Sequence, residues 1–96
     1  MDKRFSIITD DMNHCLICGS CQNIHKHEAF FGTANRSLSI KYGCVVPLCG
    51  IHHNLGNDGV HNCRKTDLYI KRIAQEAFEK KYSHEEFMRI FGKNYL

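Results

Sequence analysis

The sequence lacks any apolar run long enough to cross a membrane. The opening stretch from Met1 to Asp10 is polar, so we expect no signal peptide and no secretion. There is also no internal repeat, no low-complexity tract and only one proline, Pro47. These absences argue against a membrane-spanning protein and against a repeat array. With 96 residues, the chain is expected to form one domain.

The composition indicates a domain held together by metal. A chain of 96 residues buries only a modest core, and small domains often need a disulfide or metal staple. Six cysteines and seven histidines can supply one. In a reducing compartment, cysteines in CxxC spacing indicate metal ligands or redox groups rather than a disulfide framework. The net charge of +3 permits nucleic-acid binding but does not require it.

The sequence divides into a lead-in and one domain. Residues 1–13 are a polar lead-in whose apolar patch (Phe5, Ile7 and Ile8) predicts either an edge strand or a disordered tail. Residues 14–96 form the expected domain, with a metal-organised core over about 14–65 and helices over about 66–96. The core holds all six cysteines and six of the seven histidines. The predicted fold class is therefore α+β, with a zinc-stapled core followed by C-terminal helices.

Local patterns predict three elements. Val45 and Val46 favour extended backbone, so residues 42–48 are predicted to form a short strand that leads into Cys49. Apolar residues at helical spacing predict a helix over about 66–81. Ser83 and Glu86 have the spacing of a capping box, so a second short helix is expected to end near Gly92.

Two ligand pairs predict a structural zinc site. Cys15 and Cys18 have the x2 spacing of a zinc knuckle, and Cys49 and His52 repeat it. These four side chains are the expected Cys3His set of a treble-clef site, holding structural Zn2+. Cys21 is an alternative, because it is also spaced x2 from Cys18. The other two cysteines are expected to be a core thiol, Cys44, and a structural or incidental residue, Cys63.

Several histidines remain after this site is filled. His53 follows His52 and points in a different direction, so it is free to face a second site. In an extended segment His25 and His27 would project from the same face. Histidines from a strand and a helix start can supply a base and a metal ligand for phosphodiester hydrolysis. We expect His14 and His84 to be ordinary surface residues, and His25 is more often such a residue than a catalyst.

The order of these motifs resembles the HNH, or His-Me finger, endonucleases. The closest likeness is to small phage-type members, including the recombination-enhancing nuclease group. It spans residues 15–96 and is carried by the CxxCG knuckle and five further segments: 27–32, 34–36, 46–49, 59–61 and 91–96. The resemblance implies a ββα-metal fold and a metal-dependent DNA endonuclease or nickase. It further implies catalytic Mg2+ or Mn2+, DNA and a recombinase or other phage DNA-processing protein as partners, and a cytoplasmic location in a bacterial host.

The resemblance also assigns roles to individual residues. It makes His27 the general base and His53 a metal ligand, with His61 a possible third ligand. The asparagine that orders the loop in this family would be Asn35, with Asn54 and Asn57 as competitors. Many members have a histidine or aspartate before the base, whereas here Lys26 precedes His27. A shift of one residue would make His27 the ligand and place Glu28 at the base position.

Basic side chains near these motifs are candidates for DNA contacts. Arg36, beside Asn35 in the loop expected after the catalytic strand, is the best candidate. Such contacts would be salt-sensitive and independent of DNA sequence. No segment resembles a base-reading helix, so weak sequence specificity is expected. The alternative function is a non-catalytic zinc module that binds nucleic acid or protein. The other expected phosphate contacts are Lys41, Arg64 and Lys65.

Overall fold

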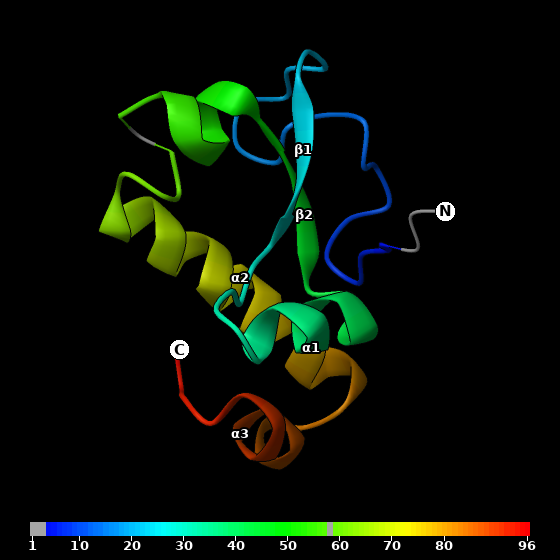
Figure 1. Ribbon diagram of the computed structural model, residues 1–96. Coiled ribbons are helices and arrows are strands. Elements are labelled where there is room, and N and C mark those ends of the chain that lie inside the picture. Colours follow the sequence, from blue (N-terminus) through cyan, green and yellow to red (C-terminus); the bar gives the residue numbers. More distant parts are fainter. Residues whose placement is uncertain (1–3, 58) are drawn as a thin grey trace.

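The computed structural model describes residues 4–57 and 59–96. A two-stranded antiparallel sheet, β1 (Ile24–Glu28) and β2 (Val45–Cys49), lies at its centre. Figure 1 shows one helical turn, η1 (Ile51–Leu55), at the end of β2, with the longer helices toward the opposite end of the sheet. These helices are α1 (Asn35–Tyr42), α2 (Arg64–Lys81) and α3 (His84–Phe91). The expected α+β architecture with C-terminal helices is confirmed at this level.

The register of the sheet brings the two halves of the predicted core together. Ile24 pairs with Cys49 and Glu28 with Val45, so the end of β2 lies beside the start of β1. Among the described residues the sheet has two strands, so each is an edge strand and β2 tolerates Pro47. The Pro47 carbonyl accepts a hydrogen bond from Leu16 N–H at 2.8 Å. That bond fixes the cysteine-bearing loop against β2. The predicted strand exists, but Tyr42 belongs to the preceding helix.

The segment expected as a loop around Asn35 and Arg36 is the helix α1, so the prediction of a loop there was wrong. Its sequence has little helical amphipathicity and offers no apolar stripe to detect. A buried polar contact adds to the packing of Leu38 and Tyr42 against the core. Ser39 is fully buried, and its hydroxyl donates to Phe30 O at 2.7 Å and accepts from Phe30 N–H at 3.1 Å. Gly43, at a φ of 76°, then ends the helix in the left-handed region.

The C-terminal helices match their predicted signals. Helix α2 begins two residues earlier than expected and ends at Lys81 as predicted. Ser83 caps α3 by accepting from Glu86 N–H at 3.1 Å, which confirms the capping box, and Gly92 ends the helix at a φ of 76°. Buried phenylalanine rings join these helices to the end of β1, with Phe30 and Phe87 centroids 5.2 Å apart. Within the described residues, no helix is long and apolar enough to span a bilayer.

The N-terminal lead-in packs on the domain without forming a strand over residues 4–13. Ile7 N–H donates to Gly43 O at 2.9 Å, and the Phe5 ring lies against the open face of Gly43. A Cβ at Gly43 would lie 2.5 Å from that ring, so the contact depends on glycine. Neither the edge strand nor the disordered tail describes this segment. Its course brings Arg4 to the Glu28 end of β1.

Candidate metal centre and histidine cluster

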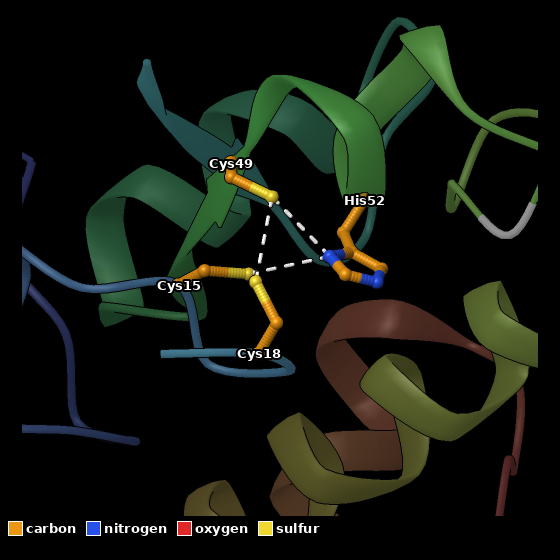
Figure 2. A group of neighbouring side chains, drawn as sticks. All are labelled: Cys15, Cys18, Cys49 and His52. Carbon is orange, nitrogen blue, oxygen red and sulfur yellow. Dashed lines mark hydrogen bonds between the residues drawn. The ribbon is translucent and has the colours of Figure 1, made fainter. Parts of the chain in front are cut away.

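Four side chains of the predicted zinc set meet at one point. Cys15 and Cys18 come from the loop before β1, Cys49 ends β2, and His52 projects from η1 (Figure 2). The Sγ atoms of Cys18 and Cys49 lie 3.7 Å apart, and Cys49 Sγ lies 3.2 Å from His52 Nδ1. All four ligand atoms lie within 4.8 Å of one another. This group could hold a metal ion.

The local backbone explains why the loop presents both thiols. Cys15 N–H donates to Ser20 O at 2.7 Å, and Gly19 N–H donates back to Cys15 O at 2.8 Å. Gly19 has a φ of 78°, which other residues rarely adopt, so the glycine after the second cysteine makes the turn possible. The resulting knuckle points the sulfur atoms of Cys15 and Cys18 toward Cys49 (Figure 2).

The distances in this cluster and the electrostatics at Cys15 suit a bound cation. Two sulfurs that each lie about 2.3 Å from one tetrahedral ion are separated by roughly 3.8 Å, close to the Cys18–Cys49 spacing. Burial raises the pKa of the Cys15 thiol, but hydrogen bonds from the backbone at Cys49, Cys18 and Ile17 outweigh it and lower the pKa to about 6. The thiolate form that metals bind is therefore favoured at Cys15.

The remaining cysteines lie outside this cluster among the described residues. Cys44 is fully buried, as expected for a core thiol, and burial raises its pKa to about 12. Cys21 is exposed and does not replace Cys15 in the group. Cys63 is half-buried at the residue before α2.

A second group brings together His27, His53 and His61. One nitrogen of each ring lies within 4.8 Å of the others, so this group could also hold a metal ion. His27 comes from β1, His53 from η1 and His61 from the loop before α2. The Nε2 atoms of His53 and His61 are 3.2 Å apart. Two nitrogens about 2.1 Å from one ion lie roughly 3.0–3.4 Å apart for bond angles from 90° to 109°.

His27 is the most buried member of this histidine cluster, with 3% of its surface exposed. Its Nε2 atom is buried and makes no hydrogen bond to the described residues. A buried polar atom without a partner is costly, so this nitrogen is a candidate for contact with a ligand, an ion or a reacting group. Burial, with the nearby His53, His61 and Lys71, lowers the pKa of His27 to about 3. The ring is therefore neutral near pH 7, and its lone pair can bind a cation.

The histidine cluster opens into a cavity of about 620 Å³. Three cationic side chains line it and face one carboxylate, Glu28. Arg36 Nε donates to Glu28 Oε1 at 2.6 Å, and Arg4 Nη2 donates to the same oxygen at 3.4 Å. The excess of positive charge suits an anionic ligand such as a phosphate diester. The lining residues are Arg4, Lys26, His27, Glu28, Phe31, Gly32, Thr33, Arg36, His53 and His61.

Other predicted site residues lie away from this cavity. Asn35 is the first residue of α1, and neither it nor Lys41 in the last turn of that helix is among the cavity-lining residues described. Arg64 and Lys65 begin α2, where Arg64 pairs with Asp67 at 3.4 Å. Of the four expected phosphate contacts, the structure brings only Arg36 to the cavity.

Sequence reasoning missed two residues with clear places in the site. The sequence places Arg4 in the lead-in, and the apolar residues after it are a signal that this segment packs on the core. Asn62 orders the loop that carries His61, because its Nδ2 donates to Asn54 O at 2.8 Å and to Gly56 O at 2.9 Å. This loop-ordering role was expected at Asn35, Asn54 or Asn57. A side-chain bond to a backbone carbonyl leaves no trace in the sequence.

In comparisons with known proteins, no family model, curated protein or solved structure matches the chain.

Proposed function

We propose that this chain is a metal-dependent DNA endonuclease of the HNH type, built on a structural zinc site. The observation that carries the proposal is the meeting of three imidazoles at the wall of a cationic cavity, directly beside a Cys3His cluster. The adjacent residues His52 and His53 belong to the two different clusters. The short helical turn η1 therefore contributes a residue to the proposed structural zinc site and a residue to the proposed catalytic site.

The Cys3His cluster is assigned to zinc in a treble-clef arrangement. Three thiolates and an imidazole form a closed four-coordinate set, which is typical of structural zinc rather than catalytic zinc. A knuckle, a strand end and the start of a helical turn supply these ligands. The ion would hold the N-terminal loop, β2 and η1 in a fixed relationship, and so would fix the base of the histidine cluster.

The histidine cluster is assigned to the catalytic divalent metal. His53 and His61 are its proposed ligands, and the ion would stabilise negative charge on the phosphate and on the leaving oxygen. Imidazole nitrogens suit transition metals, whereas Mg2+ prefers oxygen ligands. Of the two ions expected from the resemblance, this donor set favours Mn2+ over Mg2+.

His27 is the proposed general base. Its ring lines the cavity and is neutral in the free protein. A pKa of about 3 makes a weak base near pH 7, so the role depends on bound substrate raising that pKa. The negative charge of a bound phosphate diester would favour the imidazolium form and raise the pKa of His27. Glu28, the alternative at this position, already accepts hydrogen bonds from two arginines. That use of its carboxylate favours His27 as the base.

DNA is the proposed substrate, and its backbone would be held by the cations that line the cavity. Arg36 has two-thirds of its side chain exposed while its Nε is bound to Glu28, so its remaining N–H groups can reach a phosphate. Arg4 and Lys26 enlarge the same positive surface. Contacts of this kind carry no base information, which supports weak sequence specificity. The proposed setting is phage-type recombination or DNA processing, with a partner such as a recombinase.

The proposal is tested by plasmid nicking. Purified zinc-loaded protein with Mn2+ is expected to convert supercoiled plasmid to the open circular form. His27→Ala should abolish nicking while the zinc content stays at about one ion per chain. His84→Ala is the matched control, because His84 pairs with Glu79 outside both clusters.

Two outcomes would contradict the proposal. Nicking that survives His27→Ala would remove His27 as the base. Zinc-loaded wild-type protein that binds DNA but never nicks it, with Mn2+ or with Mg2+, would support the non-catalytic zinc module instead.

A further inference from the structure

We propose that Asn23 and His25 form a hydrogen-bond relay that fixes the proton of His53 and points its Nε2 lone pair into the histidine cluster. The inference rests on the proposed metal role of that cluster. His25 would then be a positioning residue rather than a ligand. It touches His53 but is not a member of the group that could hold the ion.

The relay follows from two contacts. Asn23 Oδ1 lies 3.2 Å from His25 Nε2, and His25 Nδ1 lies 2.8 Å from His53 Nδ1. A carboxamide oxygen can only accept, so His25 Nε2 must carry a proton. In the neutral ring, His25 Nδ1 is then an acceptor, and His53 Nδ1 must donate to it. The proton of His53 is thereby placed on Nδ1, and its Nε2 keeps a lone pair.

That lone pair faces the rest of the histidine cluster. His53 Nε2 is 3.2 Å from His61 Nε2, a spacing that matches two nitrogen ligands of one ion. Which nitrogen of a histidine binds metal is set by the hydrogen bond that the other nitrogen makes. Without an acceptor at His25, the proton of His53 could move to Nε2, where it would block the ligand position.

The backbone holds the relay in place. Asn23 has a φ of 53°, a left-handed conformation that asparagine tolerates better than most residues. It precedes β1 and turns its side chain toward Gly50, where an added Cβ would lie 2.3 Å from Asn23 Nδ2. His25 lies in β1 with its ring nearly perpendicular to that of His53, at an interplanar angle of 87°. The strand and the turn therefore present both members of the relay to η1.

The first test reads the tautomer of His53 directly. Long-range 1H–15N NMR on the zinc-loaded full chain, without a second metal, is expected to show the proton on His53 Nδ1. In His25→Phe, which keeps an aromatic ring but removes the acceptor, the His53 signals should shift toward the Nε2–H tautomer. His84→Phe is the control and should leave His53 unchanged, because His84 lies outside both clusters.

The second test measures Co2+ binding to the zinc-loaded protein by its visible absorption. Loss of a residue that orients a ligand commonly costs 10–100-fold in metal affinity, and we expect roughly that loss in His25→Phe. Asn23→Gly removes the acceptor but keeps the left-handed backbone, so it should weaken Co2+ binding in the same direction. Asn23→Asp keeps the acceptor oxygen and should retain both the tautomer and the affinity.

The outcomes distinguish failure of the proposed relay from failure of the proposed nuclease function. If His53 keeps its proton on Nδ1 in both His25→Phe and Asn23→Gly, with unchanged Co2+ affinity, the relay is wrong even where DNA is cut. If the tautomer and the affinity shift as expected but DNA is never cut, the relay holds and the nuclease assignment fails. Should His25→Phe not fold, an unchanged His53 tautomer and an unchanged Co2+ affinity in Asn23→Gly alone would overturn the relay.

Discussion

The Nε2 atoms of His53 and His61 lie 3.2 Å apart although the two residues are eight positions apart along the chain. The loop closes because Val60 N–H donates to His52 O at 2.9 Å and His61 N–H donates to His53 O at 3.2 Å. Gly59 allows this approach, since a Cβ there would lie 3.0 Å from His53 O. The proposed catalytic metal site therefore depends on how this loop folds back onto η1.

Loss of the Asn62 side-chain donor should weaken this loop. Asn62→Asp keeps the shape of the side chain but replaces two donated hydrogen bonds with repulsion between oxygens. We expect unfolding free energy to fall by about 1 kcal/mol and Mn2+ affinity to fall several-fold, because His61 is less well placed. Calorimetry of Mn2+ binding to the zinc-loaded protein measures the affinity, and denaturant unfolding measures the free energy of unfolding. An Mn2+ affinity equal to that of wild type would show that the loop does not need the Asn62 hydrogen bonds to place His61.

Removal of a proposed zinc ligand should unfold the domain. Cys49→Ser is expected to lose the zinc and the cooperative unfolding transition, since structural zinc contributes on the order of 10 kcal/mol to the folding of small domains. Cys21→Ser is the matched control, and it should retain zinc and change unfolding free energy by less than about 0.5 kcal/mol. Elemental analysis and circular dichroism report on both. Zinc loss in Cys21→Ser would mean that Cys21 is the true ligand.

Thiol alkylation should distinguish the cysteines by environment. At pH 8 the zinc-loaded protein is expected to react first at the exposed Cys21, outside the cluster. Cys44 should stay unlabelled, because burial raises its pKa to about 12 and leaves roughly one part in 10⁴ as thiolate. Chelation of zinc should expose Cys15, Cys18 and Cys49 to the reagent. Mass spectrometry locates the labels, and early labelling of Cys44 would argue against a packed core around it.

Arg36→Ala and Arg4→Ala should weaken DNA binding without changing the zinc content. Removal of one arginine that neutralises a phosphate should reduce the slope of log affinity against log salt concentration by about 0.9 for duplex DNA. Lys41→Ala is the matched control, since Lys41 is exposed but lies outside the cavity lining. Fluorescence anisotropy across a salt series gives the slopes. Equal slopes for all three variants and wild type would show that DNA does not contact the cavity through Arg36 or Arg4.

Ser83→Ala should destabilise the domain modestly and leave both clusters intact. The serine accepts a hydrogen bond from Glu86 N–H at the start of α3, and loss of such a cap costs about 1 kcal/mol. For a domain of this size that corresponds to a fall in Tm of about 4–8 °C. Ser83→Asp can restore the cap and should recover most of the loss. Thermal unfolding measures both variants. A Tm of Ser83→Ala equal to that of wild type would show that the serine cap does not stabilise the domain.

The sequence determined the features that depend on short-range spacing. The two x2 ligand pairs, the helical period of α2 and the capping box at Ser83 are all local patterns, and each appears in the structure. Helix α1 could not be predicted from the sequence, because that segment has no apolar stripe and because Ser39 contacts Phe30, nine positions away along the chain. A local pattern cannot report a bond that forms only after the chain has folded back.

Tertiary structure decided which residues share the site. The antiparallel register sets β1 beside β2. The cysteine cluster joins η1 to the end of β2 and to the loop before β1, and the returning loop adds His61 to His53. The packed lead-in brings Arg4 to Glu28, while Asn35 stays on α1 outside the cavity lining. The short spacing within each ligand pair predicts that both of its members can reach one ion, because the chain between them is short. Proximity between distant segments depends on packing and hydrogen bonds that no single segment encodes.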